Sequence, residues 1–265
     1  MKTETKIIVF TYLAFGIYCL LDEIYFKDLR NAINQIVNIG GVSHILTYLI
    51  SGIPVFIGLL LIHGFKKSVN GFGFTGSFSK GIFVPLLFTL PMFVGFAIVF
   101  DLNSEMNVDD FLIQVVSAAF FEELYFRGFL FGQLFRFTKV GFIPSVFLGS
   151  LLFGFIHLYQ SQEFIESTGI FAITFLGGIL FAWVFAEWNF NIWIPIFLHF
   201  FMNLSALLFY ATENALGGLY FNVFRLITIV FVIAGTIIYK RKKGLKLEVN
   251  KNTIWMKTNS NQKDY

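Results

Sequence analysis

The sequence predicts an all-α, polytopic integral membrane protein with about eight transmembrane helices. Of its 265 residues, 57% are hydrophobic, 20% are aromatic and only 13% are charged, which is far from the composition of soluble globular domains. The charged residues gather in short stretches between long uncharged segments. About 20 apolar residues cross a bilayer as a helix, and several of these segments approach that length. A chain of this kind is expected to span the membrane as a bundle of helices.

The uncharged segments are the candidate transmembrane helices. The first follows Lys2 and Lys6 and lacks a small-x-small cleavage site, so we expect a retained anchor rather than a signal peptide. After it, residues 22–44 mix polar and apolar side chains and are expected to form an amphipathic helix on the membrane surface. We expect one multi-pass domain over residues 1–246 and a polar, disordered tail over 247–265. The eight segments cover residues 7–21, 45–62, 81–100, 111–135, 140–158, 169–186, 191–210 and 219–239.

The charges of the loops predict the orientation, because Lys and Arg are retained in cytoplasmic loops. With eight crossings, both termini are predicted to lie in the cytoplasm. The inner loops and tail then carry Lys66, Lys67, Lys80, Arg136, Lys139, Lys240, Arg241, Lys242, Lys243 and Lys246. The outer loops carry Asp101, Glu105, Asp109, Asp110, Glu163, Glu166 and Glu213.

Charge and cysteine content exclude several classes of protein. The net charge of +3 is small and lies in loops and tail, so no nucleic-acid partner is expected. Cys19 is the single cysteine, which leaves no disulfide framework and no thiolate metal cluster. We find no internal repeat of the kind that inverted-repeat transporters carry.

Three charged residues stand inside the fourth segment, where each costs at least about 2.5 kcal/mol on insertion scales. Glu123 and Arg127 are four residues apart and share a helix face, whereas Glu122 projects to the side. The spacing predicts that Arg127 neutralises Glu123 in a structural ion pair and leaves Glu122 free to face a polar cavity. The alternative is an ion pair that stabilises the helix packing and has no chemical role.

Two further segments carry polar groups that can meet these carboxylates. His157 ends the fifth segment, and His199 and Asn203 lie four apart on one face of the seventh. A single membrane histidine is more often a satisfied hydrogen-bonding group than a catalyst, and we expect His63 to be such a group. Under the predicted topology the other groups fall in the middle or outer part of their helices, in a cavity between the fourth, fifth and seventh helices.

The convergence of these groups points to a hydrolase. A carboxylate removed from bulk water can act as a base, and with a neutral imidazole beside it can deprotonate a water molecule. We assign that role to Glu122 and His157. The oxyanion of a tetrahedral intermediate needs donors aimed at it, and His199 and Asn203 can supply them.

These motifs resemble a known family of membrane proteases. Glu122-Glu123 to Arg127, Phe153 to His157 and His199 to Asn203 are similar to the three motifs of the CAAX protease and bacteriocin-processing (CPBP, or Abi) family of intramembrane endopeptidases. The resemblance covers about residues 111–210. It implies that Glu122 is the catalytic glutamate, His157 its partner, and His199 with Asn203 the oxyanion side.

A metal is a separate question. The family is often labelled a metalloprotease family, and Glu122, His157 and His199 would be a two-His, one-carboxylate zinc set with an open position for water. The same residues support a metal-free glutamate mechanism, which we slightly favour. No His-Glu-x-x-His helix fixes two ligands at once.

The expected substrate is a membrane-associated peptide or protein, lipidated or amphipathic, processed in the manner of a CAAX, bacteriocin or pheromone precursor. Composition suggests a bacterial cell membrane. One alternative is a non-proteolytic membrane binding or immunity protein that uses the same helices. Another is a proton-coupled transporter with Glu122 and the histidines as a relay. The sequence leaves the oligomeric state open.

Overall fold

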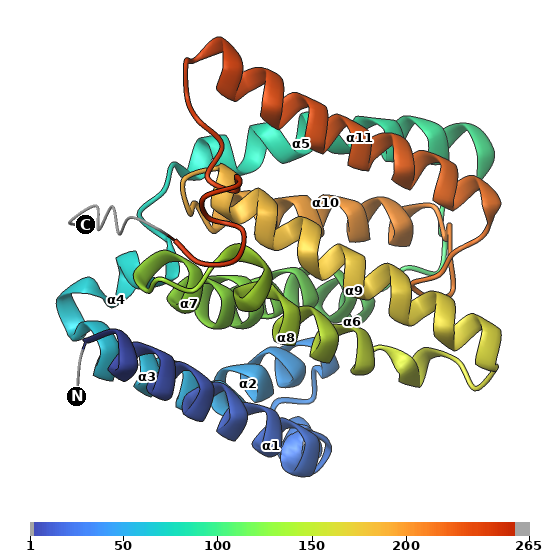
Figure 1. Ribbon diagram of the computed structural model, residues 1–265. Helices are drawn as coiled ribbons and strands as arrows, with labels where there is room; N and C mark the ends of the chain where they lie inside the picture. The colour runs from blue at the N-terminus through green and yellow to red at the C-terminus, as the bar shows by residue number, and fades with distance from the viewer. Residues whose placement is uncertain (1–2, 258–265) are drawn as a thin grey trace.

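The computed structural model describes residues 3–257, and the regular elements in that range are helices (Figure 1). The all-α class is confirmed. In the described range, the one pairing of β type is an isolated antiparallel bridge between Val140 and Met256. The elements are α1 (Thr3–Val37), α2 (Gly40–Ser51), α3 (Ile53–His63), α4 (Phe65–Phe72), α5 (Phe78–Val99), α6 (Val108–Asp110), η1 (Phe111–Phe131), α7 (Gly132–Phe137), α8 (Phe142–Phe155), η2 (Leu158–Gln160), α9 (Phe164–Glu187), α10 (Trp193–Leu208) and α11 (Leu219–Lys242).

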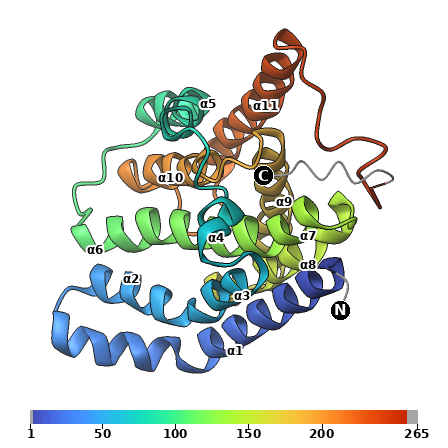
Figure 2. The same ribbon diagram turned by 90° about the vertical axis from the view of Figure 1, so that its left-hand side faces the viewer.

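The helices stack in layers, with η1 inside the molecule. In both views α1 to α4 form one outer layer, η1 lies next with α7 and α8, α9 and α10 follow, and α5 and α11 cover the opposite side (Figures 1 and 2). Every residue from Glu123 to Phe131 is buried. Glu123 and Arg127 are therefore surrounded by protein rather than by lipid.

The structure does not confirm the count of eight spans. Among the described residues, five helices are long and apolar enough to cross a membrane, or six if α2 and α3, which are bent by 41°, form one span. The helix α10 has 16 residues, about 24 Å at 1.5 Å per residue, which is shorter than a hydrocarbon core of about 30 Å. The helix η1 carries three charged residues and is shielded by its neighbours. Length and composition therefore support five or six of the expected spans among the described residues.

The predicted surface helix at residues 22–44 is not a separate element. The first helix continues without a break from Thr3 to Val37, and α2 begins at Gly40. The bend between α2 and α3 falls at Gly52, where a Cβ atom would overlap the Tyr125 hydroxyl. That hydroxyl donates to the Tyr48 carbonyl at 2.7 Å. A glycine thus lets η1 pack directly against the turn.

Two polar contacts involve Gln133 on α7, the helix that continues η1. His63 Nε2 lies 2.6 Å from Gln133 Oε1, so the prediction that His63 is a satisfied hydrogen-bonding group is confirmed. The Gln133 amide also donates to the Gly71 carbonyl at 3.0 Å. These bonds join α3 and α4 to α7.

The chain after α11 includes the segment predicted to be a disordered tail. Residues 247–257 form bends and turns and make hydrogen bonds to α9 and to the start of α8. Hydrogen bonds to groups in other helices hold the segment. Such contacts cannot be predicted from hydropathy. Residues 258–265, which the same prediction included, lie outside the described residues.

Candidate active site

One cavity is lined by all the candidate site residues predicted from the sequence. It has a volume of about 1500 Å³, and its walls come mainly from η1, α8, α9, α10 and α11, with single residues from α5 and α6. The prediction placed it between the fourth, fifth and seventh segments and did not include α9 and α11. The residues predicted from sequence that line the cavity are Glu122, Glu123, Arg127, His157, His199 and Asn203.

Glu123 and Arg127 form a buried pair on η1. Arg127 Nη1 lies 3.3 Å from Glu123 Oε1, and the side chains are 3% and 0% exposed. The guanidinium also stacks over the ring of Phe153 on α8, 4.4 Å from its centroid, and lies 5.6 Å from that of Phe181 on α9. Such cation–π contacts stabilise a charge removed from water. Arg127 thereby ties η1 to both neighbouring helices.

Glu123 has a second partner that the sequence did not indicate. Its Oε1 lies 2.9 Å from His199 Nδ1 on α10. A carboxylate can only accept, so His199 donates from Nδ1, and this bond fixes the orientation of the ring. The face of Phe181 supports the imidazole at 5.4 Å between ring centroids. Glu123 therefore orients a histidine as well as pairing with Arg127.

Glu122 has a different environment from its neighbour. Its side chain is 15% exposed and lines the cavity, and its Oε2 lies 4.0 Å from His199 Nε2. That distance exceeds a hydrogen bond. Within the described range Glu122 has no Lys or Arg partner in an ion pair. Of the two carboxylates, Glu122 is the one that a bound molecule can reach.

His157 reaches the cavity from the end of α8. Its Nδ1 donates to the Phe153 carbonyl at 2.6 Å, and its ring lies 4.5 Å from that of Phe153. This bond leaves Nε2 as the free nitrogen. Both side chains lie in the described range, and Glu122 and His157 do not form an ion pair within 4.0 Å. Both residues line the same cavity.

Asn203 lies one turn after His199 on α10. Its amide donates to the Gln114 carbonyl of η1 at 2.7 Å. The residue lines the cavity together with His199. Nothing in the sequence pointed to Gln114, because its contribution is a backbone carbonyl.

The donor set does not fit a zinc ion as arranged here. Among residues 3–257, no group of three or more His, Cys, Asp and Glu side chains lies close enough to hold a metal ion. The candidate ligands Glu122, His157 and His199 line one cavity, but they do not form such a group. We therefore derive no chemical step through a metal.

The cavity has further acidic lining residues. Three carboxylates line it, and sequence reasoning placed them in outer loops without connecting them to the site: Glu105, Asp110 and Glu213. Arg225 also lines it, but its guanidinium donates to the carbonyls of Ala215 and Leu216 at 2.7 and 2.9 Å. The signal available in the sequence was the acidic character of the predicted outer loops.

Fold and site together define a class: a polytopic membrane protein whose helices enclose a cavity with carboxylate, imidazole and amide groups. Residues 105–205 match the family model described as type II CAAX prenyl endopeptidase Rce1-like. The matched range runs from the loop before α6 into α10 and contains all three motifs. The predicted resemblance to the CAAX protease and bacteriocin-processing family is confirmed over these residues. No curated protein and no solved structure matches the chain.

Proposed function

We propose that this protein is an intramembrane endopeptidase that hydrolyses a peptide bond with a water molecule activated by Glu122. The main support for this proposal is that two adjacent carboxylates have different environments. Glu123 is held by Arg127 and His199, whereas Glu122 faces the cavity. A carboxylate without a cation partner in a protein-enclosed cavity has no structural use and is suited to proton transfer. The family match supports a protease.

Water activation is assigned to Glu122 and His157. The Nδ1 hydrogen of His157 is used by the Phe153 carbonyl, so in the neutral ring Nε2 accepts a hydrogen bond. A water between the two residues donates one hydrogen to His157 and the other to Glu122. Glu122 removes the second proton as the water oxygen attacks the substrate carbonyl carbon. This arrangement requires room for one water molecule between the two side chains, which line the same cavity.

To complete the reaction, the oxyanion must be stabilised and the leaving amine must be protonated. The new oxyanion accepts a hydrogen bond from Asn203 and another from His199 when its Nε2 carries a proton, while Glu123 holds the Nδ1 hydrogen. Donors fixed in advance stabilise the tetrahedral intermediate without reorganisation. Glu122 then returns its proton to the amide nitrogen as the carbon–nitrogen bond breaks. The products are a new carboxyl group and a free amine, and Glu122 is restored.

The cavity suits a peptide more than a small metabolite. Its volume of about 1500 Å³ exceeds the roughly 300–1,000 Å³ of ordinary small-molecule pockets. Apolar side chains such as Met92, Leu180 and Ile229 line it together with the polar groups. A lipidated or amphipathic membrane peptide, as in CAAX, bacteriocin or pheromone processing, meets both requirements. The proposed location is a bacterial cell membrane, with both termini in the cytoplasm.

The test is peptide cleavage by the purified full-length protein in lipid vesicles. We expect the wild type to cut at least one member of a panel of lipidated and amphipathic peptides, detected by mass spectrometry. Parallel reactions with a chelator report whether a metal is needed. If folded wild type cuts nothing and a Glu122→Gln variant still supports function in cells, the protein is a binding or immunity protein. Solute flux into the vesicles without cleavage would indicate a transporter.

Replacing Asn203 with alanine is expected to lower kcat by about 100- to 1,000-fold, the usual cost of losing one oxyanion donor. KM should change little, because the lost interaction forms mainly in the transition state. Steady-state rates in vesicles measure both constants. Leu204→Ala, at the next position on α10, serves as the control and should stay near wild type. An equal loss in both variants would mean that helix packing, and not the amide, is responsible.

A further inference from the structure

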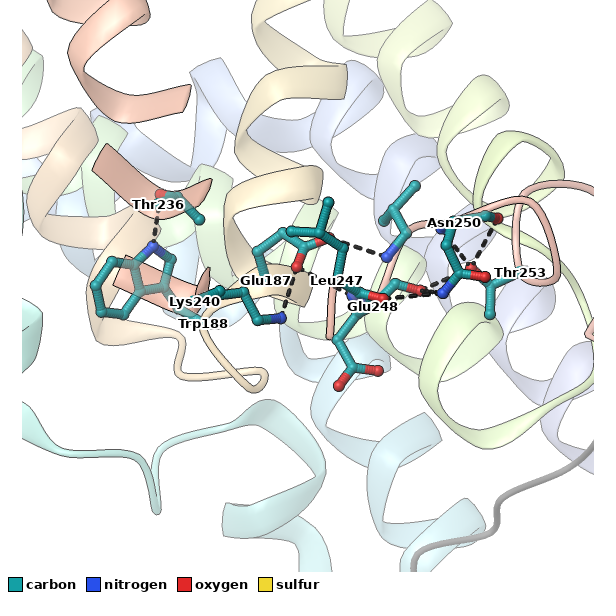
Figure 3. Close-up of polar contacts among 9 residues, drawn as sticks. Glu187, Trp188, Thr236, Lys240, Leu247, Glu248, Asn250 and Thr253 are labelled. Carbon is teal, nitrogen blue, oxygen red and sulfur yellow. Dashed lines mark hydrogen bonds and ion pairs between the residues drawn. The ribbon is translucent and has the colours of Figure 1, made fainter. Parts of the chain in front are cut away.

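Glu187 is a buried carboxylate at the end of α9 that the proposed reaction does not use. Its Oε2 lies 2.6 Å from Lys240 Nζ on α11, with side chains 0% and 6% exposed. The carboxylate also accepts the backbone N–H groups of Glu248 at 3.0 Å and Val249 at 2.9 Å (Figure 3). Two of its three donors belong to residues 247–257, here termed the C-terminal strap.

Burial of this charge and docking of the strap depend on each other. A buried carboxylate is costly unless it is paired with a cation and hydrogen-bonded. With the strap displaced, the Glu187 oxygen that faces Val249 would lose its donor, and Lys240 would be the remaining partner. The ion pair therefore favours the docked state of the strap.

The other end of the strap caps α8. The first N–H groups of a helix have no acceptor within the helix, and no side chain of the described residues caps this one. Backbone carbonyls of the strap take that place. The bonds run from Phe142 to Thr253 at 2.8 Å, from Ile143 to Ile254 at 2.9 Å and from Gly141 to Trp255 at 3.0 Å.

Close approach and further bonds hold the strap against the loop before α8. A Cβ atom on Gly141 would overlap the carbonyl group of Trp255, so only glycine fits there. The Lys257 backbone donates to the Lys139 carbonyl at 2.9 Å, and its ammonium donates to the Phe135 carbonyl. Burial lowers the pKa of Lys257 to about 8, so the ammonium form still prevails at neutral pH.

The capped helix carries a residue of the proposed active site. The helix α8 has 14 residues, about 21 Å at 1.5 Å per residue, and His157 follows its last turn. Beyond His157, Gln160 accepts the N–H of Ala215 at 2.7 Å. A helix moves as a nearly rigid body, so a shift at its strap-bound end is transmitted to His157.

We propose that the C-terminal strap is a positioning element of the active site. By docking on Glu187 and capping α8, it holds His157 at the position from which it binds the water that Glu122 activates. Glu187 is then a positioning residue that acts through the strap. This inference rests on the proposed function.

A pair of deletions gives the first test. Deleting residues 247–265 removes the strap, whereas deleting residues 258–265 leaves it in place and is the matched control. We expect the first deletion to lower kcat by about 10- to 100-fold, since a misplacement of about 1 Å can cost about 100-fold. KM should change little, and the control should keep wild-type kinetics. An unchanged kcat after the first deletion would overturn the proposal.

A rescue experiment separates positioning from general folding. Glu187→Leu/Lys240→Leu removes both charges together, so neither is left buried alone, and the strap loses its acceptor. Val140→Cys/Met256→Cys, in a Cys19→Ser background, places two thiols at the antiparallel bridge. Paired residues there lie about 4.5–5.5 Å apart between Cα atoms, within the range of a disulfide. In the protein that also carries Glu187→Leu/Lys240→Leu, we expect oxidation of the two thiols to raise kcat back toward the wild-type value. Reduction of the disulfide should lower kcat again.

The same variants distinguish failure of this inference from failure of the proposed function. The yield of the disulfide can be measured by an assay that does not depend on catalysis. It is compared between the protein that keeps Glu187 and Lys240 and the protein that carries Glu187→Leu/Lys240→Leu. We expect a lower yield when the charges are absent, because the strap is then undocked for longer. Equal yields, or a formed disulfide that does not restore kcat, would overturn the proposal. A wild type that cuts no peptide would instead overturn the proposed function.

Discussion

Replacing Glu122 with glutamine is expected to abolish peptide cleavage while the protein stays folded and inserted in the membrane. Loss of a general base typically costs about 100- to 10,000-fold, and within the described cavity the neighbouring carboxylate is committed to Arg127 and His199. Glutamine keeps the size of the side chain but cannot take a proton from water. The measurement is the initial rate of cleavage in vesicles on the best peptide of the panel.

The matched control for that variant is Glu163→Gln. Glu163 is an exposed carboxylate on the loop before α9, so the same chemical change there should leave the rate unaltered. Cleavage by Glu122→Gln at the wild-type rate would show that another group activates the water. The mechanism assigned to this cavity would then be wrong, although the family match over residues 105–205 would stand.

Replacing Arg127 with methionine is expected to cause the largest loss of stability. Glu123 is fully buried, and its Oε2 has no hydrogen-bond partner among the described residues. Removing one member of a buried ion pair costs about 3–5 kcal/mol, because it leaves an uncompensated charge. The free energy of unfolding in mixed detergent micelles, followed by circular dichroism, measures this loss.

The double variant Glu123→Gln/Arg127→Met is the control for that prediction. Both charges are gone, so most of the lost stability should return. The glutamine can still accept the Nδ1 hydrogen of His199, so the ring keeps its orientation. If the single and double variants are equally stable, or if the single variant matches the wild type, the pair does not stabilise the bundle as its geometry implies.

The two halves of the Glu122-Glu123 motif have separate tasks, and this separation links stability to chemistry. Arg127 contacts Glu123, Phe153 and Phe181, and so joins the helices η1, α8 and α9. Phe153 in turn accepts the hydrogen bond from His157. A change in the structural pair is therefore expected to alter the position of His157 as well.

Much of the fold class and the site could be predicted from composition and spacing. A chain with 57% hydrophobic and 13% charged residues forms a helical membrane bundle, because unpaired backbone groups are costly in lipid. The i, i+4 spacing of Glu123 and Arg127 sets them on one face by helix geometry, and the 3.3 Å contact follows. Charged and imidazole groups in such segments are rare enough to indicate function.

Other features depended on contacts between helices distant in sequence. The bond from His199 to Glu123 joins residues 76 positions apart, and the number of spans depends on which helices are shielded by others. The order of the strap depends on carbonyls that cap α8 and on one buried carboxylate. Hydropathy and helical spacing describe local surroundings along the chain. Only the tertiary structure decides which acceptor reaches which donor, because backbone groups are alike in every residue and leave no mark in the sequence.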